Sequence, residues 1–170
     1  MRIACIGDSV TFGQNVRATQ AWPHLLHILT GHDVRNLGVN GDTTRLGLER
    51  WHRDVDLSKP DIVVVQFGHN DANEWHGRPR VSKDAYVQNI SEMRGKAVEA
   101  GATKFIILAP HDTPDKDAAY KARLRAYQGE LQTVADASKP LPIPLLEDGY
   151  HCHPSPYGHS LYAEHVAGQL

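Results

Sequence analysis

A serine near the amino terminus and an Asp-x-x-His segment near the carboxyl terminus carry the residue types of nucleophilic catalysis. Ser9 ends the segment Gly7-Asp8-Ser9, and Asp148-Gly149-Tyr150-His151 follows the last apolar run of the chain. A serine hydroxyl becomes nucleophilic when a base takes its proton, and a third group must hold that base in the correct tautomer. The sequence therefore predicts Ser9 as the nucleophile, His151 as the base and Asp148 as the carboxylate that orients it.

Acyl transfer also needs hydrogen-bond donors for the negative charge that develops on the substrate's carbonyl oxygen. The candidates are the backbone N–H groups of Ser9 and Gly41 and the side-chain amide of Asn70, each of which follows an apolar run. Donors of this kind contribute about 3 to 4 kcal/mol apiece to transition-state stabilisation. The chain has no Gly-x-Ser-x-Gly segment around Ser9, which excludes an α/β-hydrolase arrangement for this serine.

Apolar runs alternate with segments of helical spacing along the chain. The longer runs are nearly continuous, as expected for strands that are covered on both faces. The predicted strands are residues 2–6, 33–37, 62–67, 104–109 and 141–146. The predicted helices are residues 21–29, 46–53, 82–100, 115–137 and 155–169.

This alternation predicts an α/β fold, a three-layer α/β/α sandwich with a parallel sheet between two layers of helices. Five strands suit the flavodoxin-like order 2-1-3-4-5, and we expect one domain over residues 1–170. Ligands bind such sheets where the winding direction switches, which in this order is between the first and third strands. Residues 7–9 and 68–71 end those two strands, so we expect them to lie side by side.

The chain resembles the SGNH (GDSL-type) hydrolases in four segments that occur in the family's order. Gly7-Asp8-Ser9 looks like the first sequence block of that family, Gly41 the second, Gly68-His69-Asn70-Asp71 the third and Asp148-x-x-His151 the fifth. The resemblance extends over residues 7–151, and it implies a flavodoxin-like fold and ester hydrolysis without a metal or other cofactor. It also implies Ser9, Asp148 and His151 as catalytic residues, and Ser9, Gly41 and Asn70 as the oxyanion hole.

The last block departs from the family pattern, because the segment from Asp148 to Gly158 is about two residues longer than usual. Counting forward from Asp148 selects His151 as the base. Counting back from Gly158, or matching the His-Pro pair, selects His153. We favour His151, since the spacing of the carboxylate is a mechanistic requirement and the length of a loop is not.

Composition indicates a globular domain, and the partner expected from its site residues is a small-molecule ester. The 170 residues are 41% hydrophobic and 22% charged, and the formal net charge is −2. Because the signs are interspersed, we predict no surface for nucleic acid or an anionic membrane. No apolar stretch approaches the roughly 20 residues of a spanning helix, and no cleavable signal is recognisable, so we expect a cytoplasmic protein. Cys5 and Cys152 do not suggest a disulfide framework, and association into a homo-oligomer stays open.

The main hypothesis is a serine esterase that removes a short acyl group such as acetyl, because a chain of this length has little material for a lid or a long acyl tunnel. The same acyl-serine intermediate could pass its acyl group to another acceptor, as in an acyltransferase. A phospho-receiver module fits less well, since Asp8 is followed by Ser9 instead of a second acid and no lysine occurs beyond Lys139.

Three further features have interpretations of their own. His151-Cys152-His153 could be mistaken for a metal site, but complementary ligands at zinc-like spacing are missing from the sequence. The long segment 68–80 is a candidate substrate-facing loop, in which Trp75 and Arg78 are the predicted substrate contacts. The charged residues from Lys116 to Arg125 are interpreted as a solvated helix face.

Overall fold

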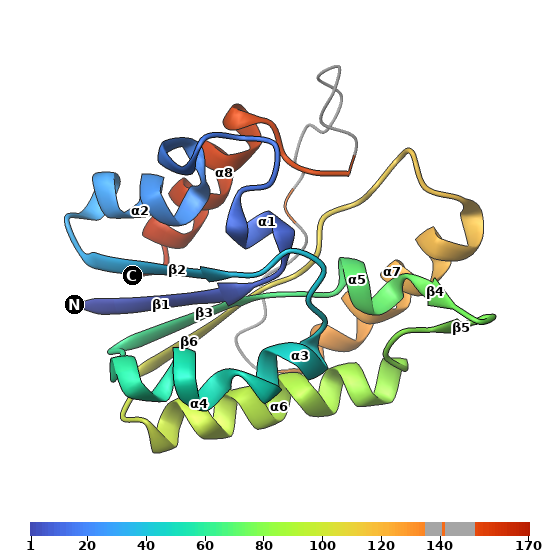
Figure 1. The fold of residues 1–170 in the computed structure, drawn as a ribbon, viewed down its shortest axis with the longest axis horizontal. Coiled ribbons are helices and arrows are strands. Elements are labelled where there is room, and N and C mark those ends of the chain that lie inside the picture. Colours follow the sequence, from blue (N-terminus) through green and yellow to red (C-terminus); the bar gives the residue numbers. More distant parts are fainter. Residues whose placement is uncertain (135–140, 142–151) are drawn as a thin grey trace.

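A parallel sheet of four strands forms the centre of the described part of the chain. The computed structural model describes residues 1–134, 141 and 152–170. The strands lie in the order β2 (Asp33–Gly38), β1 (Arg2–Gly7), β3 (Ile62–Gln66) and β6 (Lys104–Leu108), as Figure 1 shows. All three pairings between them are parallel. This order confirms the predicted flavodoxin-like fold for its first four strands, and the predicted fifth strand lies outside the described residues except for position 141.

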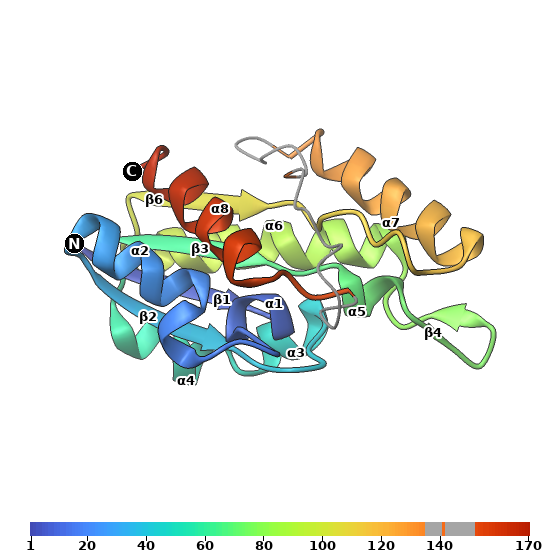
Figure 2. The ribbon, with the colours of Figure 1, turned by 90° about the horizontal axis from the view of Figure 1, so that it is seen from above.

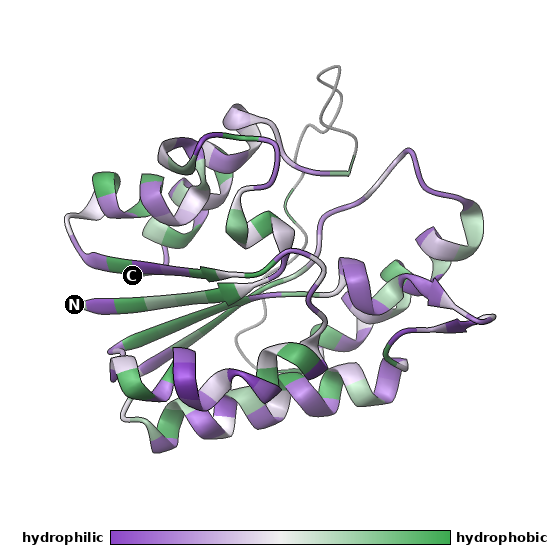
Figure 3. Cartoon of the chain, in the orientation of Figure 1, coloured by the Kyte–Doolittle hydropathy of each residue, from purple (hydrophilic) through white to green (hydrophobic). Residues whose placement is uncertain are grey.

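Helices cover both faces of the sheet, which accounts for the nearly continuous apolar runs. Alternate residues of β1 point to opposite faces: Ala4 and Ile6 belong to one buried cluster, and Ile3 and Cys5 to the other. Figure 1 shows the strands between one layer of helices above and another below, and Figure 2 shows the same layers from above, one in front of the sheet and one behind it. Figure 3 shows apolar residues concentrated on the strands. The prediction of a three-layer sandwich is therefore confirmed.

The longer helices divide between the two faces. Side chains of α3 (Thr44–Glu49), α4 (Trp51–Asp54), α6 (Lys83–Glu99) and α7 (Ala118–Leu131) pack on the cluster around Ala4 and Ile6. Side chains of α1 (Ser9–Phe12), α2 (Trp22–Thr30) and α8 (Pro156–Ala167) pack on the opposite cluster. The remaining elements are η1 (Ala18–Gln20), η2 (Asp56–Ser58), α5 (His69–Ala72) and the strands β4 (Glu74–Trp75) and β5 (Arg78–Pro79).

Side-chain caps decide where several helices begin. Ser82, Asp117 and Ser155 each accept a hydrogen bond from a backbone N–H in the first turn of α6, α7 and α8, respectively. The predicted start of α7 at residue 115 was therefore three residues early, because Asp117 is the cap. No helix among the described residues has both the length and the apolar character needed to cross a bilayer.

Two predicted segments differ from the structure in detail. The single helix predicted at 46–53 is divided into α3 and α4 at Arg50, which has a non-helical backbone. The segment 68–80, predicted as irregular, contains α5 and a small antiparallel hairpin of β4 and β5. His76 and Gly77 connect these two strands with φ of 50° and 74°, the positive values that a tight two-residue hairpin turn requires.

Candidate active site

Ser9 is the first residue of α1, directly after the carboxyl end of β1. Asp8 caps this short helix, since its side chain accepts a hydrogen bond from the N–H of Val10 at 2.9 Å. Gly38 at the end of β2 lets α1 approach closely, because a Cβ there would lie 2.1 Å from the backbone nitrogen of Phe12. As the first helical residue, Ser9 has a backbone N–H without an acceptor inside its own helix. The fold thus presents both the hydroxyl and the N–H of Ser9 at one edge of the sheet.

An imidazole from the other end of the chain lies beside this serine. The Nε2 atom of His153 is 2.9 Å from the Oγ atom of Ser9. His153 stands just before α8, whose N-cap is Ser155 and whose first residue is Pro156. A proline at this position favours the start of a helix, so α8 begins at a fixed place three residues after His153.

A buried histidine holds the residue that precedes His153. His111 is fully buried, and its Nε2–H donates to the carbonyl oxygen of Cys152 at 3.2 Å. Its Nδ1 atom then accepts from the hydroxyl of Tyr162 on α8 at 2.8 Å. Burial lowers the pKa of His111 well below its usual value, so the ring stays neutral with the proton on Nε2. His111 therefore links α8 to the backbone beside His153.

The two other predicted donors lie at the same cavity as Ser9. Gly41 has a φ of 81°, a left-handed conformation that favours glycine. Its carbonyl oxygen accepts from Nη1 of Arg80 at 3.0 Å, and the next carbonyl, of Asp42, accepts from Nδ2 of Asn70 at 2.9 Å. These bonds hold the loop that carries the N–H of Gly41, and Asn70 keeps a second amide hydrogen for another acceptor.

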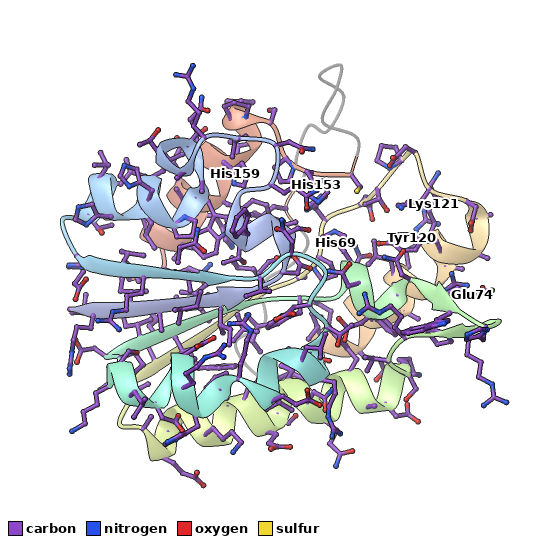
Figure 4. All side chains as sticks on the ribbon, in the orientation of Figure 1. His69, Glu74, Tyr120, Lys121, His153 and His159 are labelled. Atoms are coloured by element: carbon purple, nitrogen blue, oxygen red, sulfur yellow. The ribbon has the colours of Figure 1, made fainter. Side chains whose placement is uncertain are left out.

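The cavity at Ser9 is small and carries one ammonium group. Its volume is about 190 Å³, and Ser9, Gly41, Asn70, Lys116, Tyr120 and His153 are among the residues that line it. Figure 4 shows His69, Tyr120 and His153 gathered beyond the carboxyl ends of the strands. No aspartate or glutamate is among the described residues of the lining.

An arginine that sequence reasoning missed ties three parts of this edge together. Arg50 contacts Asp42 at 2.7 Å and Asp54 at 2.8 Å, and its Nη2 donates to the carbonyl oxygen of Gly7 at 3.1 Å. Its side chain is only 9% exposed. The end of β1, the loop after β2 and the end of α4 are thus joined through one guanidinium group. Nothing local distinguishes Arg50 in the sequence, because it lies among other charged residues of a helical segment.

Asp71 braces the loop after β3. It is fully buried, and it accepts hydrogen bonds from the backbone N–H of Thr44 at 3.1 Å and from the Thr44 hydroxyl at 2.5 Å. Burial raises the pKa of Asp71 to about 6, although both bonds from Thr44 act in the opposite direction. The carboxylate therefore joins α5 to α3.

The structure brings together three of the predicted site residues and one that was weighed as an alternative. Ser9, Gly41 and Asn70 line one cavity with His153, whereas the favoured base His151 and its predicted partner Asp148 lie outside the described residues. The spacing from Asp148 favours His151 in the sequence. Local spacing carries no information, however, on which histidine the tertiary fold brings to Ser9.

The predictions for the neighbouring segments have different outcomes. Trp75 and Arg78 pair across the projecting β4–β5 hairpin and do not belong to the lining of this cavity, so their contact with substrate stays a prediction. Lys116 does line it, so the interpretation of residues 116–125 as a solvated face is wrong at that position. Among the described residues, no three His, Cys, Asp or Glu side chains are placed to hold a metal ion.

Known proteins share this sequence pattern and this fold. The GDSL-like Lipase/Acylhydrolase family model matches residues 5–161. An arylesterase of Vibrio mimicus is 31% identical over 106 residues, which are 59% of this chain and 50% of that protein. The esterase TesA of Pseudomonas aeruginosa is 28% identical over 149 residues, which are 85% of this chain and 70% of that protein.

A solved structure resembles the whole chain. An acetylxylan esterase from Geobacillus stearothermophilus, solved as a catalytic mutant, superposes with a TM-score of 0.78 and 20% identity, over 99% of this chain and 93% of that one. This similarity shows a shared fold. In sequence, the chain spans about half the length of the Vibrio arylesterase.

Proposed function

Because the chain belongs to the GDSL-like lipase/acylhydrolase family, we propose that it is a serine esterase that hydrolyses short-chain esters such as acetyl esters. The observation that carries the proposal is the distance of 2.9 Å between Nε2 of His153 and Oγ of Ser9. A base at this distance can take the proton of a hydroxyl directly. We assign this role to His153 instead of His151, and Asp148 remains the proposed carboxylate partner of the base.

The reaction has two halves. In the first, Oγ of Ser9 attacks the ester carbonyl carbon while its proton moves to Nε2 of His153. The N–H groups of Ser9 and Gly41 and the amide of Asn70 stabilise the oxyanion of the tetrahedral intermediate. The intermediate collapses to acyl-Ser9, and the imidazolium returns the proton to the departing alkoxide. In the second half, His153 takes a proton from the water that attacks the acyl carbon. The imidazolium then returns this proton to Oγ of Ser9 as the carbon–Oγ bond breaks, which releases the carboxylic acid and restores the free serine.

The size of the cavity supports a short acyl group. Its volume of about 190 Å³ lies below the roughly 300 to 1,000 Å³ of typical pockets for drug-sized ligands. Part of this space must hold the carbonyl group and the first atoms of the alcohol, so little is left for a long acyl chain. The proposed substrate is accordingly a small-molecule ester, and no cofactor takes part in the steps above.

The proposal is tested with p-nitrophenyl esters of increasing acyl length. We expect hydrolysis of the acetate to exceed that of the octanoate strongly, and Ser9→Ala to lower kcat/KM by about 10³-fold or more. Ser91→Ala changes an exposed serine of α6 and is the matched control, which should keep wild-type activity. A fluorophosphonate should phosphonylate Oγ of Ser9 with loss of fluoride, so the peptide that contains Ser9 should gain the mass of the phosphonyl group. Unchanged turnover in Ser9→Ala would falsify the proposal, and acyl transfer to an added alcohol without free acetate would identify a transferase instead.

A further inference from the structure

Lys116 places a positive charge in the cavity that holds Ser9 and His153. It lies in the segment between β6 and α7 and lines the cavity together with Tyr120 and Cys152. Its Nζ atom is 5.5 Å from the centre of the Tyr120 ring, a distance at which the ring's electrons attract a cation. Over the described ranges, Lys116 has no carboxylate partner within 4.0 Å. Within the described part of the chain, the cavity therefore presents an ammonium group that no carboxylate contacts directly.

The neighbours of Lys116 indicate which half of a substrate meets this charge. Cys152 adjoins His153, and its Sγ atom is 3.7 Å from Nδ1 of that imidazole. Lys116 and Cys152 line the same cavity. Burial raises the pKa of the Cys152 thiol, the ammonium of Lys116 lowers it, and the carboxylate of Asp115 raises it. In the proposed reaction, the imidazolium of His153 delivers its proton to the departing alkoxide. The alcohol half therefore lies beside His153, in the cavity that Lys116 also lines, and the acyl group lies on Ser9.

We infer that Lys116 selects esters whose alcohol half carries a negative charge, such as a carboxylate or a phosphate group. The inference rests on the proposed function and adds the class of alcohol to it. An anion on a substrate displaces water from a small, partly enclosed cavity, where the effective dielectric constant is lower than in bulk water and the attraction is correspondingly stronger. A neutral alcohol half gains no electrostatic attraction from the ammonium group of Lys116. A cationic one is repelled.

Two esters with the same acyl group and the same aromatic ring isolate the charge. The anionic substrate is 4-acetoxybenzoate, and the neutral one is its methyl ester. The two leaving groups differ in intrinsic reactivity by a factor that is the same for every variant. The ratio of their kcat/KM values, compared between variants, therefore reports the contribution of the side chain alone.

The variants are Lys116→Gln, Lys116→Glu and Lys116→Arg. We expect Lys116→Gln to lower the ratio of anionic to neutral kcat/KM by about tenfold, the effect of roughly 1.4 kcal/mol, because only the anionic ester loses an attraction to the ammonium group. Lys116→Glu should lower the ratio further, and Lys116→Arg should retain most of it. Lys121→Gln is the matched control, because that lysine donates to the carbonyl of Pro114 and lines a different cavity. Its ratio should equal that of the wild type.

The outcomes separate this inference from the proposed function. An unchanged ratio in Lys116→Gln, or an equal loss for both esters, overturns the role of Lys116 in selection and leaves the esterase proposal intact. Wild-type protein that hydrolyses neither ester, and that a fluorophosphonate does not label at Ser9, overturns both. A ratio that falls in Lys116→Gln and is restored in Lys116→Arg supports the inference.

Discussion

His153 Nε2 lies 2.9 Å from Ser9 Oγ, although 144 positions separate the two residues in the chain. Two packed helices explain how they meet. The ring centres of Trp22 on α2 and Tyr162 on α8 are 6.4 Å apart. The backbone N–H of Trp22 donates to Nδ1 of His159 on α8 at 3.2 Å. α8 thereby lies beside α2, on the face of the sheet where α1 also packs, and its amino-terminal end carries His153 to the serine.

Replacement of each candidate base separates the two histidines. We expect His153→Ala to lower kcat for p-nitrophenyl acetate by about 10³-fold or more, because the serine loses the group that takes its proton. His151→Ala should keep activity within a few-fold of wild type. Steady-state kinetics of both variants makes the comparison, and circular dichroism verifies that each is folded. Retained activity in His153→Ala together with loss in His151→Ala would show that the base is the residue favoured by the sequence.

Asn70→Ala tests the proposed oxyanion hole. The variant loses the amide that donates in the transition state, so kcat should fall by about 10²- to 10³-fold while KM changes little. Asn73→Ala is the matched control, because Asn73 lines the same cavity and is not a proposed donor. Since Asn70 also holds the carbonyl of Asp42, the melting temperature of both variants must be measured. A KM effect without a kcat effect would contradict the assignment.

His111 is predicted to act by positioning His153. His111→Phe removes the donor to the Cys152 carbonyl, and a small displacement of the base should lower kcat by about 10- to 100-fold with little change in KM. Gln retains a donor near Nε2, so His111→Gln should recover part of the loss. Tyr162→Phe removes the donor to Nδ1 and should give a smaller reduction. Equal activity of the Phe and Gln variants, at equal stability, would argue against positioning.

Stability should depend on pH through His159. Burial lowers the pKa of His159 from 6.5 to about 4, so the unfolded state binds its proton first as pH falls. The stability present above pH 6.5 is therefore lost progressively between pH 6.5 and 4, by about 3 kcal/mol for this group. His159→Asn keeps an acceptor for the Trp22 N–H and does not titrate.

Urea unfolding at several pH values measures this effect. Between pH 7 and pH 4, the free energy of unfolding of the wild type should fall by about 3 kcal/mol more than that of His159→Asn. His76→Asn, in the exposed hairpin turn, is the control and should follow the wild type. Parallel pH profiles for the wild type and His159→Asn would contradict the assignment.

Arg50→Met should destabilise the fold strongly. The substitution leaves the carboxylates of Asp42 and Asp54 without the guanidinium that both contact, and breaking a buried ion pair in this way costs about 3 to 5 kcal/mol. Denaturant unfolding measures the loss. Arg53→Met is the control, since the Arg53 side chain is 73% exposed and its pairing with Asp54 contributes little. Equal unfolding midpoints for the two variants would show that the Arg50 network is not stabilising.

The sequence predicts elements whose signals are local. The helix predicted at 82–100 corresponds to α6, because Ser82 caps it and apolar residues recur at helical spacing. The continuous apolar run of 62–67 likewise corresponds to β3. Ser9, Gly41 and Asn70 share a cavity as expected, since each lies two to four residues after the end of a strand and parallel strands end at one edge of the sheet.

What the sequence does not predict depends on contacts between distant segments. Arg50 meets Gly7 across 43 positions, and His111 meets Cys152 across 41, so no local spacing marks either residue. The division of the predicted helix 46–53 has the same origin, because Arg50 lies at the break and is held from outside the helix. Lys116 looked like part of a charged helix face, and only the path of the loop before α7 brings it to Ser9.

The brevity of α1 has a consequence for how the protein becomes active. Four residues are too few to form a stable helix by themselves, so β1, β2 and β3 must pair before Ser9 takes up its final position. The imidazole arrives only with α8, at the far end of the polypeptide. During renaturation, turnover should therefore return after the helical circular dichroism signal, and ester cleavage becomes a sensitive reporter of completed assembly.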